Sequence, residues 1–204
     1  GKVYIRDACQ AIDAKVNEYS VAHLGRAVCF SLHPLKNLNV AGDGGLITTN
    51  DDALAHDLRL LRNHGLATRD IVDRPGYNHR LDAIHAIVAF HGLKELDWIT
   101  EQRIKNAATY DALLGSCPLV TIPPRAPNVR QVYHTYVVQV ERRHALQAWL
   151  AEHGVETKVH YPIPIHLQPG YRHLGYEPGS LPETERQAGR ILSLPIHQYL
   201  AAEE

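Results

Sequence analysis

The chain has 204 residues, of which 45% are hydrophobic and 21% are charged, and its formal net charge is −1 at pH 7. This length and composition are typical of a globular protein with a substantial core. A net charge so close to zero gives no electrostatic reason to expect a nucleic acid or membrane-surface partner. No apolar run approaches the roughly 20 residues that a membrane-spanning helix requires.

Cysteine and histidine usage argues against a disulfide framework and against a metal site. The three cysteines have neither metal-ligand spacing nor the even count of a secreted disulfide framework, so we expect a reducing, cytoplasmic location. Three of the fourteen histidines, His160, His166 and His173, cluster in the last third of the chain. Their spacing matches no common zinc pattern and no acidic or cysteine partner accompanies them, so we expect no metal.

The first third of the chain has the pattern of an α/β sheet. Short apolar or β-branched runs at residues 3–5, 27–30 and 46–49 are bounded by polar or glycine-containing segments, as buried strands are. A helix is predicted next, with an N-cap among residues 50–52 and leucines recurring on one face. Gly65 is placed to end this helix.

A longer helical pattern follows, in which one apolar stripe starts at Leu81 and can continue to Leu114. That length suits a helix that links two domains. Beyond a proline-rich stretch, strands are predicted over 132–138 and 155–160. The capping-box string at 180–183 predicts the start of a last helix.

The change of pattern between residues 100 and 118 marks a domain boundary. We expect residues 1–108 to form part of a large α/β domain that ends in the connecting helix, and residues 109–204 to form a smaller α+β domain. The chain starts directly in a predicted strand and contains no methionine. We therefore expect it to be an internal piece of a longer protein.

Lys36 has the most suggestive position of any residue, because it lies in a loop behind the apolar run at 27–30. A lysine amine delivered from such a loop can bond covalently to a carbonyl carbon. Taken singly, a lysine is more often a solvated surface residue. Asp7 ends another apolar run, where open α/β sheets place their ligands, although it could also cap a helix. Together the two residues suggest a pyridoxal phosphate site.

Four strings, in this order, carry a family resemblance: YIRDACQA, FSLHPLKNLNVAGDGGLITTND, GYNHRLDAIHA and VHYPIPIHLQPGY. They resemble the DegT/DnrJ/EryC1/StrS family of sugar aminotransferases over nearly the whole chain. The resemblance implies the pyridoxal-phosphate-dependent transferase fold of type I, an α/β fold. It also implies that this chain holds the C-terminal part of the large domain and the small α+β domain, and lacks an N-terminal part that completes the cofactor site.

The resemblance assigns roles around the cofactor, pyridoxal 5'-phosphate. Lys36 bonds to the cofactor aldehyde and Asp7 pairs with the pyridine nitrogen, which keeps the ring an effective electron sink. Gln10 lies beside the ring hydroxyl and Ser31 donates to the phosphate. Asn78 reaches the cofactor phosphate of a second subunit, which implies a homodimer with a shared active site. From the residues alone, Gln10, Ser31 and Asn78 remain open to plainer readings as capping, turn or surface residues.

His160 and Tyr161 open a string that resembles a substrate-side loop of nucleotide-sugar members of the family, and we expect both near the sugar. Arg6 and Cys9 stand where the family has a glutamate and an alanine. Neither departure changes a cofactor-contacting residue type, although Arg6 can alter the surroundings of the site. Cys9 is better read as a small buried residue than as a nucleophile.

The resemblance implies an aminotransferase that uses an amino acid donor, expected to be glutamate, and a keto sugar carried by a nucleoside diphosphate. Such an enzyme serves amino-sugar biosynthesis for a cell-surface polysaccharide or a natural product. Dehydratases of the family replace the lysine by histidine, so Lys36 argues against that activity. Two alternatives stay open: a cyclitol ketone as the substrate, and a non-catalytic protein with the same fold.

Overall fold

The computed structural model describes residues 2–201 of the chain. It divides into two compact units, which are Gly1–Glu101 with Ala126–His134, and Gln102–Arg125 with Thr135–Glu204. The chain passes from the first unit to the second within helix α3 (Leu96–Leu114). The domain boundary expected after residue 108 falls in the same helix, and the division into a large and a small domain stays a prediction.

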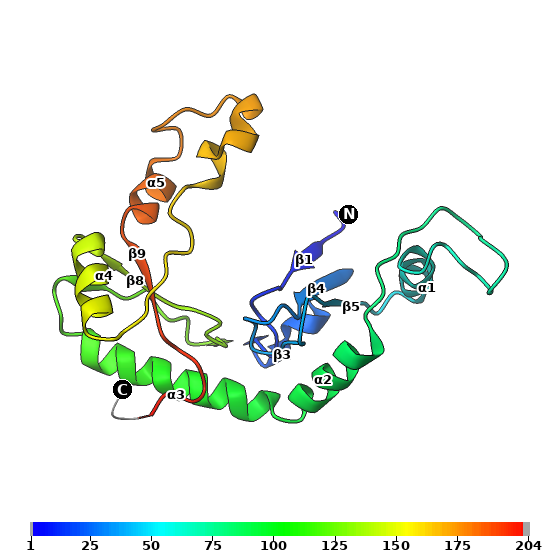
Figure 1. The fold of residues 1–204 in the computed structure, drawn as a ribbon, viewed down its shortest axis with the longest axis horizontal. Helices are drawn as coiled ribbons and strands as arrows, with labels where there is room; N and C mark the ends of the chain where they lie inside the picture. Colours follow the sequence, from blue (N-terminus) through cyan, green and yellow to red (C-terminus); the bar gives the residue numbers. More distant parts are fainter. Residues whose placement is uncertain (1, 202–204) are drawn as a thin grey trace. The chain divides into compact units, whose positions relative to one another are not determined.

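A three-stranded sheet forms the centre of the first unit (Figure 1). Its strands are, in spatial order, β1 (Ile5–Asp7), β4 (Ala27–Ser31) and β5 (Gly45–Thr48). β4 is parallel to β1 and antiparallel to β5. Three of the five residues of β4 are buried. The strand predicted from the apolar run at 27–30 is therefore confirmed as the central strand of this sheet.

β1 departs from the sequence expectation. A buried strand over residues 3–5 was predicted, but the strand begins at Ile5 and all three of its residues are exposed. The prediction of burial was wrong because β1 lies at the edge of the sheet that the described residues form, with β4 beside it. Only the central strand of a three-stranded sheet has a neighbour on both sides.

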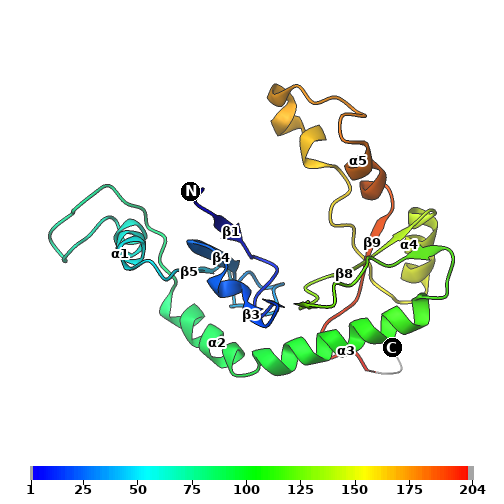
Figure 2. The ribbon, with the colours of Figure 1, turned by 180° about the vertical axis from the view of Figure 1, so that it is seen from behind.

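A second, smaller sheet anchors a distant segment to the first unit. It joins β3 (Tyr19–Ser20), β2 (Lys15–Val16) and β7 (Val129–Arg130), all antiparallel, and Figure 2 shows β3 from behind. Ser20 also caps the short 3-10 helix η1 (Val21–His23). β7 lies in the segment Ala126–His134, so this sheet fixes that segment against residues more than a hundred positions earlier in the chain.

The core of the first unit surrounds the loop that follows β4. One buried cluster consists of Leu32, Leu38, Val40 and Ala89, and the partly buried Leu46 of β5 packs against it. A second cluster combines β4 residues with the turn after β1. Both ends of the loop between β4 and β5 are thus held in the core by apolar side chains.

Helix α1 (Asp52–Leu61) confirms the first helix prediction, but it ends at Leu61 with Arg62 as its C-cap, so the prediction that Gly65 ends it was wrong. The side chain of Asp51 occupies the N-cap position and accepts a hydrogen bond from the Leu54 backbone N–H at 3.0 Å. Leu60 is buried against the rest of the unit. A short polar N-cap followed by an amphipathic pattern was therefore a reliable signal at this site.

The single long helix predicted from residue 81 to residue 114 was wrong. The structure has two helices, α2 (Ala83–Leu93) and α3, separated by a turn at residues 94–95. In that turn, Glu95 N–H donates to the Gly92 carbonyl at 3.1 Å, a bond of the tighter 3-10 type. Gly92 favours a break there, since glycine weakens a helix interior.

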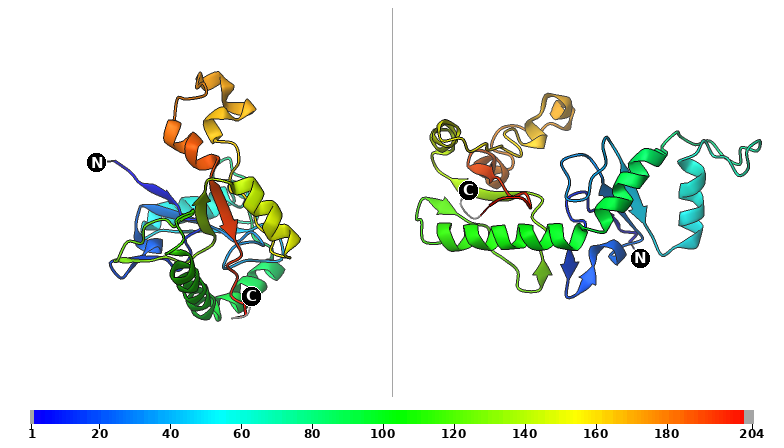
Figure 3. Two further views of the ribbon diagram at one scale, coloured as in Figure 1. Left: turned by 90° about the vertical axis from the view of Figure 1, so that its left-hand side faces the viewer. Right: turned by 60° about the horizontal axis from the view of Figure 1, so that its bottom comes forward.

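The second unit is built on an antiparallel sheet in the order β6 (Val120–Thr121), β8 (Tyr136–Val140) and β9 (Ile191–Leu194). Helix α4 (Arg143–Glu152) packs against β9 (Figure 3). The strand predicted over 132–138 begins only at residue 136, and the strand predicted over 155–160 is reduced to one bridge between Lys158 and Ser193.

No helix within residues 2–201 is long and apolar enough to cross a membrane.

The last helix starts differently from the capping-box prediction. α5 (Pro182–Ala188) follows the 3-10 helices η2 (Ile165–Leu167) and η3 (Pro169–Leu174), and no side chain caps its N-terminus. Ser180 instead accepts from the Glu177 backbone N–H at 3.0 Å. Glu185 accepts from the backbone N–H groups of Gly179 and Leu181. The helix start predicted at residues 180–183 is confirmed, since α5 begins at Pro182, but the capping-box contacts are wrong because Glu185, not Glu183, accepts from the backbone N–H groups before the helix.

Glu185 also binds a buried histidine. His166 is nearly inaccessible to solvent, and its Nε2 lies 3.2 Å from Glu185 Oε1. Hydrogen bonds from the Gly179 and Leu181 amides and from His166 hold the pKa of Glu185 below its ordinary value, with the Gly179 bond as the largest cause. Glu185 therefore ties η2, the loop before α5 and α5 itself together.

Two glycines allow the loop after α1 to cross itself closely. Gly65 has φ +73°, and a Cβ built on it would overlap the carbonyl oxygen of Arg74. A Cβ on Gly76 would overlap the backbone of Gly65. This crossing places Tyr77 N–H 2.7 Å from the Leu61 carbonyl at the end of α1. The glycines therefore fix the course of the Gly76–Asn78 stretch.

We predict that Gly65→Ala destabilises the protein more than Gly154→Ala does. Gly154 has φ +80° but no atom lies within 4 Å of a Cβ built on it. Alanine there costs about 1–2 kcal/mol of left-handed backbone strain, whereas at Gly65 a clash with Arg74 is added to the same strain. Denaturant unfolding followed by tryptophan fluorescence measures both. Equal losses of unfolding free energy would show that the Arg74 carbonyl moves aside.

We predict that Glu185→Gln lowers the thermal stability at neutral pH and that the deficit shrinks in acid. A carboxylate with a lowered folded-state pKa contributes stability above its ordinary pKa of about 4.3, and that contribution disappears as the pH falls through the lowered value. Unfolding temperatures measured from pH 7 to pH 3 test this. Glu177→Gln, at an exposed site in the same loop, is the control and should leave no pH-dependent deficit. A Glu185→Gln deficit that is constant across this range would contradict the expectation.

Candidate active site

Asp7 and Ser31 lie at the same edge of the first sheet. Asp7 is the last residue of β1, Ser31 is the last residue of β4, and the two strands run parallel with Asp7 opposite Cys29. The carboxyl ends of parallel strands form the edge at which open α/β sheets bind ligands. The structure therefore gathers a carboxylate, a hydroxyl and the loop that carries Lys36 at one edge.

The Asp7 carboxylate is held in its ionised form by its neighbours. Its Oδ1 accepts a hydrogen bond from the Cys9 backbone N–H at 2.9 Å. Hydrogen bonds from the thiol and the amide of Cys9 keep the pKa of Asp7 below its ordinary value, and the positive charge of Lys36 acts in the same direction. An ionised carboxylate is what a protonated pyridine nitrogen needs as a partner.

Cys9 is a neighbour of the site whose part the sequence did not predict. Its thiol is half-buried, and the bond to Asp7 is the largest cause of its raised pKa. Lys36 lies within electrostatic range of this thiol as well. Its backbone N–H donates to Asp7 Oδ1, and its thiol lies near the same carboxylate but has the Cys29 carbonyl, at 3.9 Å, as its geometric acceptor. Its place two residues after the carboxylate was the available signal, because an aspartate side chain commonly accepts a hydrogen bond from the backbone N–H two residues on.

The backbone of Lys36 is held from both sides while its side chain is half-buried. Lys36 N–H donates to the His33 carbonyl at 2.8 Å, and the Asn39 side-chain amide donates to the Lys36 carbonyl at 3.0 Å. Ser31 accepts from the His33 N–H at 3.2 Å through its Oγ. The Ser31 O–H proton is therefore left to donate to another acceptor.

Gln10 and Asn78 lie at exposed positions. Gln10 follows Asp7 by three residues, in the turn after β1. Asn78 is in the loop after α1, where its backbone bridges to Asn63 and its Oδ1 accepts from Arg80 Nε at 3.1 Å. Among residues 2–201, no hydrogen bond or ion pair joins Asn78 to Lys36 or Asp7. The structure thus brings Asp7, Ser31 and Lys36 together and leaves Asn78 on a separate loop.

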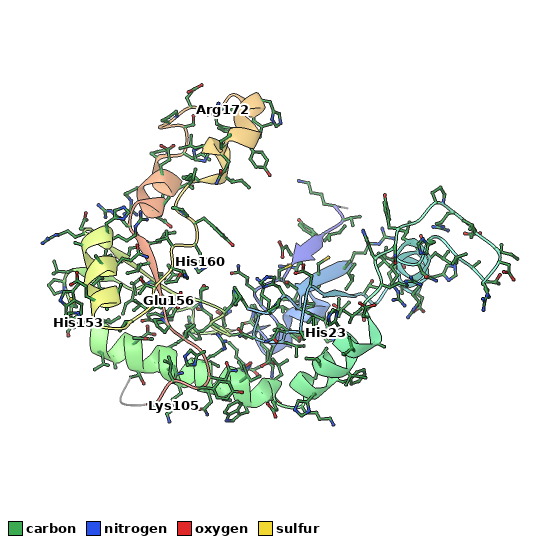
Figure 4. The ribbon with its side chains drawn as sticks, in the orientation of Figure 1. His23, Lys105, His153, Glu156, His160 and Arg172 are labelled. Carbon is green, nitrogen blue, oxygen red and sulfur yellow. The ribbon has the colours of Figure 1, made fainter. Side chains whose placement is uncertain are left out.

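His160 and Tyr161 belong to the second unit. His160 Nδ1 lies 2.9 Å from Ser193 Oγ on β9, and Figure 4 labels this histidine beside the strand. Tyr161 is exposed and meets the His160 ring edge-on, with ring centroids 5.6 Å apart. Tyr161 also lines a cavity of about 520 Å³ between the Pro162–Ile165 stretch and α5. The cavity makes Tyr161 accessible to a small molecule, while the role of both residues stays a prediction.

His166 stands in the same string as His160, but it is buried and bound to Glu185, so the expectation that no acidic side chain accompanies it was wrong. The bond links η2, whose Ile165 lines the Tyr161 cavity, to α5. Within residues 2–201, no group of three histidine, cysteine, aspartate or glutamate side chains is arranged to hold a metal ion.

Comparison with known proteins identifies the relatives of this chain. A sequence profile of the DegT/DnrJ/EryC1/StrS aminotransferase family matches residues 1–204. The chain is 45% identical over 206 residues to a pleiotropic regulatory protein of Geobacillus stearothermophilus, covering 100% of this chain and 55% of that protein. It is 38% identical over 196 residues to the dTDP-3-amino-3,4,6-trideoxy-alpha-D-glucose transaminase of Streptomyces venezuelae, covering 96% and 52%.

A solved structure has the same fold. It is that of S. venezuelae DesV in complex with a ketimine intermediate, with a TM-score of 0.94, 38% sequence identity, and coverage of 98% of this chain and 54% of that one. The chain spans about half the length of the curated relatives that it matches. The transferase fold expected from the sequence is confirmed by this likeness. The chain belongs to the DegT/DnrJ/EryC1/StrS aminotransferase family.

Proposed function

We propose that the whole protein is a pyridoxal-phosphate-dependent aminotransferase that transfers an amino group from glutamate to a keto sugar linked to a nucleoside diphosphate. One observation carries the proposal: Lys36, Asp7 and Ser31 meet at one edge of the first sheet, with Lys36 in electrostatic range of Asp7. The transaminase of a dTDP-linked amino sugar among its relatives supports the substrate class. The donor is inferred from the family resemblance.

The chemistry of these side chains fits the cofactor. When bound, pyridoxal phosphate supplies an electron sink for the negative charge left when a proton leaves the amino-bearing carbon. The ionised Asp7 accepts a hydrogen bond from the protonated pyridine nitrogen and keeps its proton in place. Ser31 Oγ, which already accepts from the His33 N–H, donates its own proton to a phosphate oxygen.

Lys36 has two tasks in this proposal. Its Nζ would hold the cofactor through the aldehyde carbon, with loss of water, and after displacement by the donor amine it would act as the base that takes the proton from the donor's α-carbon. Its half-buried position in a hydrogen-bonded loop suits a base that must meet one carbon atom repeatedly. The keto sugar then receives the amino group by the reverse sequence, so we expect ping-pong kinetics.

We also propose that the enzyme is a homodimer in which Asn78 serves the active site of the partner subunit. The exposure of Asn78, and its loop separate from Lys36, support a role toward another molecule. Gln10 is proposed beside the ring hydroxyl. His160 and Tyr161 are proposed beside the sugar, which the accessible cavity next to Tyr161 supports.

A non-catalytic regulator is the second candidate function. The relative in Geobacillus stearothermophilus, at 45% identity, is named a pleiotropic regulatory protein. A regulator with this fold has no physical need for an ionised carboxylate and an amine at one sheet edge, so the side chains favour catalysis.

A cyclitol ketone in place of the nucleotide sugar would use the same catalytic centre.

We predict that Lys36→Ala abolishes the visible absorbance band of the lysine-bound cofactor and lowers transamination by at least about 1,000-fold, since both the covalent link and the base are lost. Absorbance spectra of the whole protein with added cofactor, and a 2-oxoglutarate assay, measure the two effects. Lys105→Ala, an exposed lysine on α3, is the matched control and should keep both. A wild-type protein with no visible band after cofactor is added would favour the regulator.

We predict that the whole protein, given glutamate alone, forms 2-oxoglutarate for a single turnover. Further turnovers should require a keto nucleotide sugar. A panel of keto sugars linked to dTDP or UDP, set beside cyclitol ketones, tests this by following 2-oxoglutarate. A single turnover with glutamate alone should appear in either case and serves as the control for an active centre. Sustained turnover with cyclitol ketones alone would contradict the proposed substrate class.

A further inference from the structure

The residue after Lys36 is a buried amide. Asn37 is 5% exposed, although a buried amide destabilises the fold unless it is hydrogen-bonded. Its Nδ2 donates to the backbone carbonyl of Val132 at 2.7 Å, across 95 residues of sequence. Its Oδ1 is buried without a partner in the described part of the chain. An apolar side chain at this position would need no polar partner. The use of a buried asparagine therefore indicates that its bond to Val132 has a purpose other than filling the core.

The Val132 carbonyl is itself fixed. Val132 is buried and belongs to the segment Ala126–His134 of the first unit. Just before it, β7 pairs with β2, and Arg130 binds the carboxylates of Asp13 and, at 2.6 Å, Glu101. The acceptor of the Asn37 bond therefore lies two residues beyond a paired strand, in a segment that is tied to β2, Asp13 and Glu101 rather than to the loop that carries Lys36.

The other hydrogen bonds near Lys36 lie within its loop or join the two ends of that loop, as those from Leu32 N–H to the Gly44 carbonyl and from Val40 N–H to the Leu32 carbonyl do. The bonds from Lys36 N–H to His33 and from Asn39 to the Lys36 carbonyl connect residues three positions apart. They determine the shape of the turn, but they move with it. The Asn37 bond links the turn to a remote, anchored backbone, and because Asn37 is adjacent to Lys36 it limits where the lysine Cα can lie.

We propose that Asn37 is the positioning residue for Lys36, acting through its hydrogen bond to the Val132 carbonyl. The inference rests on the proposed function, since it concerns the place from which the Lys36 amine reaches a carbon atom. A base displaced by about 1 Å from its reacting atom can lose about 100-fold in rate. Because Asn37 is buried and touches no substrate, its loss should lower kcat and leave the KM for glutamate unchanged.

The test compares two asparagines that each donate to a distant backbone carbonyl, through a buried bond at Asn37 and an exposed bond at Asn106. Asn106 in the second unit donates through Nδ2 to the His197 carbonyl at 2.9 Å, across 91 residues. Asn37→Ala and Asn106→Ala in the whole protein each delete one side-chain bond to a distant backbone carbonyl. Thermal unfolding then reports the stability each bond provides, while cofactor absorbance and single-turnover kinetics with glutamate report the state of Lys36.

We expect Asn37→Ala to keep the visible band of the lysine-bound cofactor, to lose about 100-fold in the single-turnover rate and to retain the wild-type KM. Asn106→Ala should lose stability and keep the wild-type rate. A wild-type rate in Asn37→Ala, or an equal loss of rate in both variants, overturns the inference. A wild-type protein without the band or turnover would instead refute the proposed function, so the two failures are distinguishable.

A second variant tests the inference in case Asn37→Ala does not fold. Asn37→Asp keeps the shape of the side chain and replaces the donating Nδ2 by an oxygen, which meets the Val132 carbonyl as a second acceptor. If Asn37→Ala yields no folded protein, Asn37→Asp should show the same loss of single-turnover rate in the fraction that binds cofactor. A wild-type rate in that fraction overturns the inference.

Discussion

Burial of Leu32 before, and of Asn37 and Leu38 after, the turn that carries Lys36 is the constraint on which the rest of the site depends. Leu32 and Leu38 lie in the core of the first unit, and Asn37 is buried with them. The turn between them carries a charged amine, which must remain at the surface of that core to react. The parallel pairing of β4 with β1 then brings Asp7 to the same sheet edge. The proposed arrangement of Lys36, Asp7 and Ser31 thus follows from the packing of one strand and the loop behind it.

The sequence predicted the parts of this fold that local chemistry determines. The cap at Asp51 and the buried run of β4 were recognised because a helix start and a central strand each leave a signal within a few residues. The long helix failed where Gly92 permits a turn, and the capping box failed where Glu185 outcompetes Glu183 for the free N–H groups. In both places, two local structures were possible for the same residues. The pattern of residue types does not show which of the two the folded chain adopts.

The candidate site likewise combines residues that the sequence predicted with contacts that only the structure shows. Four strings pointed to Lys36, Asp7 and Ser31, and the structure places these three at one sheet edge. No residue pattern indicated that Asn37 binds Val132, because that contact exists only after residues 95 positions apart are folded together. It also did not distinguish the buried His166 from the accessible His160, since both belong to one string. Contacts made by tertiary packing therefore had to come from the structure.

The central claim is that Lys36 is the residue that binds the cofactor. Reduction of the whole protein with borohydride after cofactor is added converts the bond between the lysine and the cofactor into a stable amine, which mass spectrometry of proteolytic peptides can locate. The account predicts the added pyridoxyl mass on the peptide that contains Lys36. A label on another lysine, or no label on a folded protein, would contradict it.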